Sequence, residues 1–183
     1  MSPAQVFGYG SLVTGAARIV TLRGHRRVWG VAMDNRVAVP GYKVYELPDG
    51  TRPPVSVAFL DLAPDAGTAV NGGLLPVADA ALARLDERER QYERLDVTAA
   101  VAPAVADGDG PVWAYVGRAP GRARVAAGRA GTAEVVVQRA YAELVEAAFA
   151  SLGAAEFARY RASTEPPPFP LAELARVDLP GSP

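Results

Sequence analysis

The sequence predicts an α+β domain, a small mixed β-sheet or barrel with flanking α-helices. Short apolar runs bounded by glycine, proline and Asp-Gly signals dominate the first 77 residues, which is typical of strands and turns. A helical period first appears near residue 78 and returns near residue 133. The order of strands, helix, strands, helix lacks the regular alternation of a doubly wound parallel sheet. No linker or repeat divides residues 1–183, so we expect one domain.

The first part of the chain predicts strands and one long loop. Four apolar runs bounded by turn residues predict strands, at residues 4–8, 18–33, 54–62 and 71–77. The second of these alternates well enough for one bent strand or two, with breaks at Gly24 and Gly30. Residues 34–53 are rich in turn formers and predict a surface loop.

The rest of the chain predicts helices separated by strands. The periodicity predicts helices at 78–95, at 133–152 and up to about 161, and strands at 95–102 and 111–117 joined by a turn at 107–110. Asp79 is a plausible N-cap of the first helix. The second has an apolar face and ends at Gly153; that face carries Val137, Tyr141, Leu144, Ala148 and Leu152. The proline run at 165–170 excludes helix and predicts an extended tail.

Composition excludes several classes of function. The net charge is −1, which gives no signal for binding nucleic acid. The chain has no cysteine and one histidine, His25, so disulfides, thiolate chemistry and the usual zinc sites are not expected. Because neither a basic leader nor a run of membrane-spanning length is visible, we expect a cytoplasmic protein that binds no membrane.

Glu89 is the acidic residue that falls on the apolar face of the predicted helix 78–95. Successive helical residues rotate by about 100°, so Leu82, Leu85 and Tyr92 form an apolar stripe that includes Glu89. A solvated carboxylate paired with a neighbouring arginine would be ordinary. A partly desolvated carboxylate lining a cavity would instead suit a group that takes and returns a proton. Spacing alone does not choose between these readings.

The stretch Phe7–Leu12, "FGYGSL", places two glycines around a tyrosine at the end of the first strand. A dinucleotide fingerprint needs glycine where Val13 stands, a P-loop needs a nearby lysine, and a nucleophile elbow needs another frame around Ser11. A serine triad would have to use His25, in an arginine-rich run. Two interpretations of the motif remain. It is either a tight turn without a ligand, or a loop whose backbone N–H groups hold a carboxylate or an oxyanion.

Taken together, "VFGYGSLV" at 6–13 and "LDERE" at 85–89 resemble the γ-glutamylcyclotransferase superfamily. The first motif is similar to its Tyr-Gly-Ser substrate loop, and the second to its Leu-Asp-x-x-Glu segment. The continuation "ERQYER" is similar to the ChaC-like and AIG2-like branch. The resemblance runs from residue 6 to about residue 117 and implies a small β-barrel with flanking helices.

The resemblance also implies a reaction and a site. The α-amine of a γ-glutamyl amide would attack the side-chain carbonyl, closing 5-oxoproline and releasing an amine, with no metal and no cofactor. Glu89, the last residue of the second motif, would be the catalytic acid–base. The implied substrate-binding residues are Phe7, Gly8, Tyr9, Gly10, Ser11, Leu12 and Tyr115. Arg23, Arg26 and Arg27 either attract an acidic substrate or form the wet face of a strand.

Several alternatives stay open. The same fold and pocket would also serve a non-catalytic module that binds a γ-glutamyl compound or another small metabolite, and an external amine could replace the internal one. Glutathione, a γ-glutamyl amino acid, a γ-glutamyl amine and a specialised metabolite are all compatible, because "NGGLL" at 71–75 and the loop 34–53 depart from the family pattern. Oligomeric state is not visible.

Overall fold

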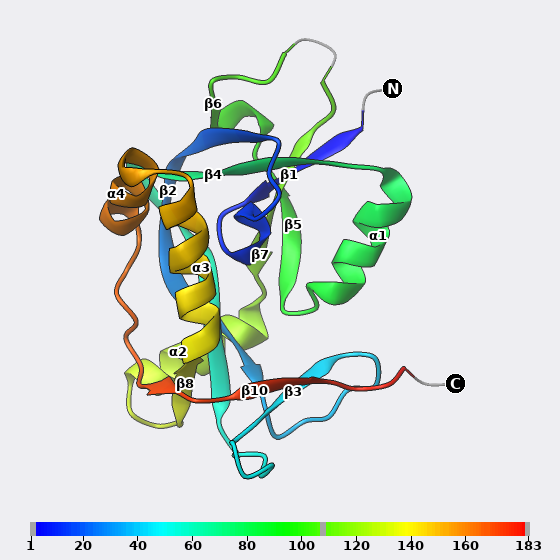
Figure 1. The fold of residues 1–183 in the computed structure, drawn as a ribbon, viewed down its shortest axis with the longest axis vertical. Coiled ribbons are helices and arrows are strands. Elements are labelled where there is room, and N and C mark those ends of the chain that lie inside the picture. Colours follow the sequence, from blue (N-terminus) through cyan, green and yellow to red (C-terminus); the bar gives the residue numbers. More distant parts are fainter. Residues whose placement is uncertain (1–2, 107–108, 182–183) are drawn as a thin grey trace.

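A mixed eight-stranded sheet curled into a half-barrel organises the computed structural model, which describes residues 3–106 and 109–181 (Figure 1). The strands run in the order β5-β7-β1-β4-β2-β6, with β8 beside β4 and β9 beside β8. Their bounds are Ala4–Gly8 (β1), Arg18–Asp34 (β2), Ser56–Val77 (β4), Tyr92–Asp96 (β5), Val101–Ala102 (β6), Val112–Gly117 (β7), Val135–Gln138 (β8) and Leu171–Ala172 (β9). The predicted α+β class and mixed sheet are confirmed.

Four α-helices flank the sheet within the described ranges. They are α1 (Asp79–Arg88), α2 (Ala119–Arg129), α3 (Arg139–Ser151) and α4 (Ala154–Ser163), with 3₁₀ turns η1 (Ser11–Val13) and η2 (Thr98–Ala100). Figure 1 shows α1 on one side of β1, β5 and β7, and α3 with α4 on the other. None of the helices in the part of the chain that the structure describes has the length and apolar character needed to cross a bilayer.

β2 and β4 form the long antiparallel hairpin at the centre of the sheet. The two strands expected at 54–62 and 71–77 are halves of β4, whose pairing with β2 shifts between Pro64 and Ala69. β2 is one strand, and its register shifts fall at Gly24, whose φ is +73°, and at Gly30. The two predicted breaks are therefore bulges in a continuous strand.

The first helix is shorter than its charge pattern predicts. α1 ends at Arg88, Glu89 is its C-cap with φ −90° and ψ 43°, and Tyr92 already pairs with Gly117 across β5 and β7. Tyr92 therefore does not continue a helical stripe with Leu82, and the helical-wheel placement of Glu89 is wrong. The reason is that cross-strand pairing with β7 overrides the helix propensity of the charged run. The N-cap is Ala78, with Asp79 in the first turn.

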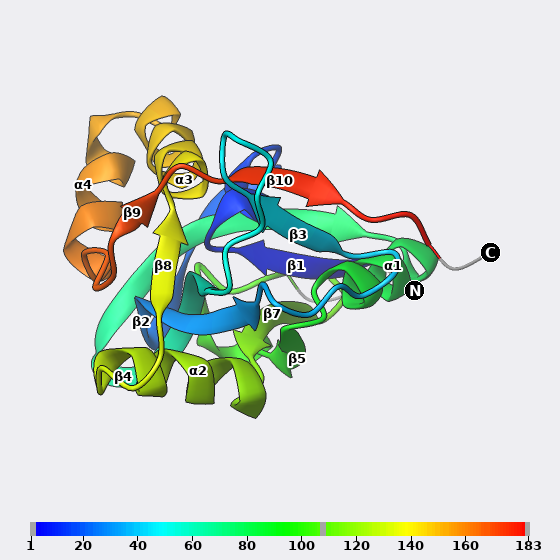
Figure 2. The ribbon, with the colours of Figure 1, turned by 90° about the horizontal axis from the view of Figure 1, so that it is seen from below.

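The stretch 34–53 is not loop throughout. It contains β3 (Lys43–Glu46), which pairs antiparallel with β10 (Ala175–Asp178) in the tail, forming a second, two-stranded sheet. Figure 2 shows β10 and β3 lying side by side along one edge of the molecule. Sequence reading missed β3 because its partner lies about 130 residues away. The extended tail after the proline run is confirmed.

The segment 118–152 also differs from expectation. α2 was not anticipated, although Pro120 in its first turn is typical of a helix start. The predicted helix 133–152 begins at Arg139, because Val135–Gln138 pairs with β4 instead. On α3 the buried residues are Val145 and Phe149, while Leu144 is 53% exposed. The short helix expected next is α4; the turn expected at 107–110 lies partly outside the described residues.

Candidate active site

Two connected cavities lie between the loop after β1, the end of α1 and helix α3. The narrow cavity is lined by Phe7, Tyr9, Gly10, Ser11, Leu12, Leu60, Glu89, Tyr92, Tyr115 and Tyr141. The wide cavity has a volume of about 630 Å³ and shares Ser11, Glu89, Tyr92 and Tyr141 with it. The structure thus brings Glu89 together with every predicted substrate-binding residue except Gly8, which lines neither cavity.

The two glycines of the loop are required by close packing, and neither has a positive φ. A Cβ on Gly8 would lie 2.7 Å from the backbone carbon and oxygen of Leu12, because the η1 turn folds back over the strand end. A Cβ on Gly10 would lie 3.0 Å from the hydroxyl oxygen of Tyr141. Gly8 therefore closes the turn, and Gly10 lets α3 approach the backbone of the loop.

The loop leaves backbone donors free. Val13 donates its N–H to the carbonyl of Gly10, as in a 3₁₀ turn, but the first amides of such a turn have no partner within it. Among the described residues, the amides of Gly10, Ser11 and Leu12 donate to no protein acceptor. Successive free N–H groups at a cavity wall are suited to binding an anionic oxygen.

Arg27 anchors this loop from the interior. It is fully buried, its Nε donates to the carbonyl of Tyr9 at 2.7 Å, and its Nη1 donates to Thr164 at 2.7 Å. Its guanidinium also lies 4.7 Å from the ring centre of Phe149 and 4.9 Å from that of Tyr160. Arg27 therefore faces neither the substrate cavity nor solvent, and both readings of it from the sequence are wrong. The exposed Arg23 and Arg26 are on the wet face of β2.

Four of the ten residues that line the narrow cavity are tyrosines. The Tyr9 hydroxyl donates to the carbonyl of Tyr115, and the Tyr115 hydroxyl donates to Asp86 at 2.8 Å. The Tyr92 hydroxyl donates to the carbonyl of Leu60 at 2.8 Å. Tyr141 packs edge-on against Phe59, with ring centres 5.1 Å apart. The hydrogen bonds hold Tyr9, Tyr92 and Tyr115 in place around the narrow cavity, whose volume is about 40 Å³.

Glu89 points into this tyrosine-lined space although it ends a helix. Its side chain is 19% exposed, and Oε1 accepts a hydrogen bond from Arg88 Nε at 3.0 Å. Burial and then the Glu89 carboxylate raise the pKa of Tyr141, and the same two causes raise the pKa of Tyr42 to about 12. The carboxylate thus combines both features that the sequence left open: it is paired with a neighbouring arginine, and it lines a cavity.

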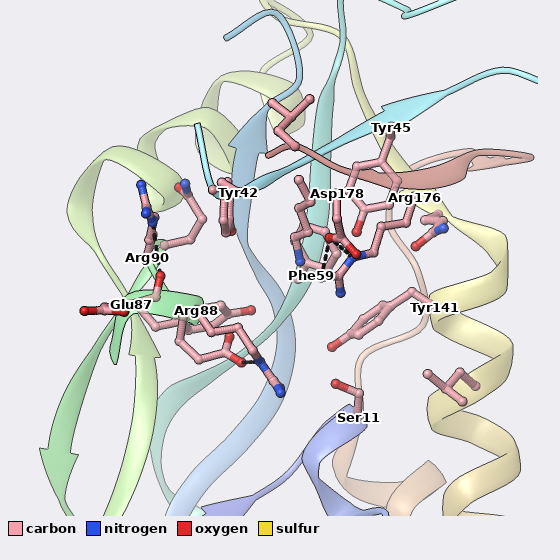
Figure 3. Close-up of a pocket in the computed structure, with 18 of the residues that line it drawn as sticks. Ser11, Tyr42, Tyr45, Phe59, Glu87, Arg88, Arg90, Tyr141, Arg176 and Asp178 are labelled. Atoms are coloured by element: carbon pink, nitrogen blue, oxygen red, sulfur yellow. Dashed lines mark hydrogen bonds and ion pairs between the residues drawn. The ribbon is translucent and has the colours of Figure 1, made fainter. Parts of the chain in front are cut away.

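The far wall of the wide cavity comes from the two-stranded sheet. Tyr42, Lys43 and Tyr45 belong to β3 and the residue before it, while Arg176 and Asp178 belong to β10. Figure 3 shows Tyr42 and Arg90 at one end of this wall and Arg176 with Asp178 at another, with Ser11 and Tyr141 directed into the space below them. Residues of the stretch 34–53, which departs from the family pattern, therefore close the pocket together with residues of β10.

Sequence reasoning missed Tyr141, Tyr92 and Lys43 as site residues. Tyr92 and Tyr141 were assigned to apolar helix faces, which is why their hydroxyls were overlooked. Lys43 is the only lysine in an arginine-rich chain, and this was the one signal available for it. Within the described residues, no group of three or more His, Asp or Glu side chains is placed to hold a metal ion.

Comparison with known proteins shows the family and the fold of this chain. A family model described as "Gamma-glutamyl cyclotransferase, AIG2-like" matches residues 6–130. A solved structure titled "Gamma-glutamyl cyclotransferase" has a TM-score of 0.53 and 13% identity, covering 94% of this chain and 95% of its own. An uncharacterized protein from Homo sapiens, loc79017, has a TM-score of 0.52 and 14% identity, covering 92% and 93%. A search of curated proteins found no match.

Proposed function

Because this chain belongs to the gamma-glutamyl cyclotransferase, AIG2-like family, we propose that it cleaves a γ-glutamyl amide by internal cyclisation, releasing 5-oxoproline and an amine. The observation that carries this proposal is the position of Glu89, which lines the same cavity as the loop Tyr9–Leu12. Glu89 and Ser11 also line the wide cavity, so a γ-glutamyl substrate held there would contact both. The proposed site residues are Glu89 as acid–base, with Phe7, Tyr9, Gly10, Ser11, Leu12 and Tyr115 around the substrate and Gly8 shaping the loop.

The substrate supplies its own nucleophile, the α-amine, so the main task of the protein is to transfer protons. The α-ammonium of the substrate loses a proton to Glu89, and the free amine attacks the side-chain carbonyl carbon. The new C–N bond closes a five-membered ring, the old C–N bond breaks, and Glu89 returns a proton to the departing nitrogen. Two protons leave the attacking nitrogen in all, and the released amine carries both away as an ammonium. General acid–base catalysis of this kind contributes roughly 10²- to 10⁴-fold.

The loop supplies the second contribution. As the amine adds, the carbonyl oxygen gains negative charge, and the free amides of Gly10, Ser11 and Leu12 are suited to stabilise either that oxyanion or the substrate α-carboxylate. Each well-placed donor is worth about 3 kcal/mol in the transition state. The tyrosine side chains around the cavity would hold the flexible γ-glutamyl chain in a folded shape close to that of the ring, which lowers the entropic part of the barrier.

The test is a mass-spectrometric screen for 5-oxoproline and free amine, with glutathione, γ-glutamyl amino acids and γ-glutamyl amines as substrates. For any substrate that is turned over, Glu89→Gln keeps the shape of the side chain and removes its proton-carrying role, so we expect kcat to fall by roughly 10²- to 10⁴-fold. Glu93→Gln is the matched control, because Glu93 is exposed on β5 and lines neither cavity.

Two outcomes would contradict the proposal. If Glu89→Gln released 5-oxoproline at the wild-type rate, Glu89 would not be the acid–base. If the wild-type protein bound γ-glutamyl compounds but released no amine from any of them, the fold would serve as a binding module.

A further inference from the structure

Lys43 is the unusual residue of the wide cavity. It lies on β3 in the wall opposite the loop, and its ammonium is surrounded by aromatic rings: Nζ is 4.5 Å from the ring centre of Phe59, 5.6 Å from that of Tyr42 and 5.9 Å from that of Tyr45. Rings at these distances attract a cation through their faces but accept no strong hydrogen bond. The ammonium keeps its capacity to donate.

Some of the other charges that line the wide cavity are neutralised in pairs. Arg176 forms an ion pair with Asp178 at 2.6 Å, and Arg88 forms one with Glu89 at 3.0 Å. Among the described residues, no carboxylate lies within ion-pair distance of Lys43 Nζ, and no acceptor is within hydrogen-bond distance of it. Arg84 and Arg90 line the same cavity and are in no ion pair among the described residues either, but both are exposed. Lys43 is the partly buried cation of the three, and burial makes its unbalanced charge costly.

Lys43 lies in the part of the wide cavity that we assign to the leaving amine of the substrate. The wide cavity extends from Ser11 and Glu89 to β3 and β10. If the γ-glutamyl group lies between Glu89 and the loop, the part of the cavity beside β3 and β10 would receive the amine that is released. We propose that Lys43 binds a carboxylate on that leaving group, so that the preferred substrates are γ-glutamyl amides of amino acids or peptides and not of simple amines. This inference rests on the proposed function and names its substrate class.

An opposing assignment would place the substrate's own α-carboxylate on Lys43. The free amides of the loop are the better partners for that group, because they lie beside Glu89, where the neighbouring α-amine must lose its proton. The two assignments make different predictions. Every γ-glutamyl amide has the α-carboxylate, but only some have a carboxylate on the leaving group, so only the assignment of Lys43 to the leaving group predicts a preference among amides.

The experiment uses two ligands that differ only in that charge: γ-glutamylalanine and γ-glutamylalaninamide. Binding is measured by calorimetry on Glu89→Gln protein, in which turnover is slowed, at pH 6.5, where the Lys43 ammonium is charged. Because this substitution removes the partner of Arg88, the measurement is repeated on Glu89→Gln/Arg88→Gln protein, which should give the same ratio. We expect the carboxylate ligand to bind at least 10-fold more tightly, as one charge-assisted hydrogen bond allows. In Glu89→Gln/Lys43→Met protein that ratio should fall to about one.

The controls separate the possible failures. Arg23→Met in the same Glu89→Gln background removes one positive charge from the exposed face of β2 and should keep the ratio. Equal binding of the two ligands, or a ratio that survives Lys43→Met, would overturn the inference while leaving the proposed function intact. Weakening of both ligands to the same extent by Lys43→Met would assign Lys43 to the shared γ-glutamyl group and also overturn it. A preserved 10-fold ratio with no 5-oxoproline release by wild-type protein would support the carboxylate site and contradict the proposed reaction.

Discussion

The Nε of Arg27 donates a 2.7 Å hydrogen bond to the carbonyl oxygen of Tyr9, so a buried cation of the central hairpin holds the loop that borders the proposed active site. The same guanidinium bonds to the carbonyl of Asn71 and to the hydroxyl of Thr164. Strand, loop and tail therefore meet at one side chain. Burial lowers the pKa of Arg27 to about 10, which leaves it charged at neutral pH.

Replacing Arg27 by methionine should lower the free energy of unfolding by about 3 kcal/mol, because several buried acceptors lose a charged donor together. Arg27→Lys keeps the charge but not the planar fork, so it should recover only part of this loss. Urea unfolding followed by circular dichroism measures both. A methionine variant as stable as the wild type would mean that water replaces the guanidinium at this site.

Gly8→Ala tests why the motif begins with glycine. The added Cβ would lie 2.7 Å from the backbone of Leu12, and neither strand nor turn can yield without moving the free amides of the loop. We expect kcat/KM for a turned-over substrate to fall at least 10-fold, with a stability loss of about 1–3 kcal/mol. Gly67→Ala is the control, since its Cβ would meet only the Asp65 side chain, at 3.7 Å. Wild-type kinetics in Gly8→Ala would show that the loop adapts.

Lys43→Met should stabilise the fold at neutral pH. Burial lowers the pKa of Lys43 from 10.5 to about 8, whereas the unfolded chain keeps the higher value. Below pH 8 both states are protonated and the folded state bears the full cost of the buried charge. Between about pH 8 and pH 10.5 the unfolded state binds more protons, so the wild-type free energy of unfolding rises with pH.

The stability advantage of Lys43→Met should accordingly be about 1–3 kcal/mol at pH 7 and shrink towards zero as pH rises to 10.5. Thermal unfolding of both proteins at a series of pH values measures it. A pH-independent difference would indicate a packing effect of the methionine instead of the removal of a buried charge.

Asp61 and Asp65 form a matched pair for the electrostatics of β4. The buried Asp61 carboxylate accepts hydrogen bonds from the N–H of Gly117 at 2.7 Å and from Arg122 Nε at 2.9 Å. Asp61→Asn places amide protons against these donors and should cost about 3 kcal/mol of stability. Asp65 faces Arg26 at 4.0 Å on the surface, so Asp65→Asn should change stability by no more than about 0.5 kcal/mol. Equal losses measured by urea unfolding would contradict this assignment.

Local sequence determined the elements whose signals are short-range. The apolar run ending at Gly8, the strand around Tyr115, the helix after Gly153 and the absence of helix in 165–170 were all predicted from a few neighbouring residues. The bends of β2 at Gly24 and Gly30 were anticipated for the same reason, since a glycine interrupts a strand wherever it occurs. The pairing of the loop motif with Glu89 came from resemblance and from the order of the two motifs.

Only the tertiary structure decided where those residues meet. Glu89 reaches the cavity because α1 stops one residue earlier and the chain turns into β5, not because a helical stripe carries it there. Lys43 became a cavity residue when β3 paired with β10 across most of the chain, and Arg27 became buried when α3 and α4 covered β2. Contacts between residues distant in sequence leave no local periodicity, and for this reason the far wall of the pocket could not be predicted from the sequence, whereas the glycine loop after β1 could.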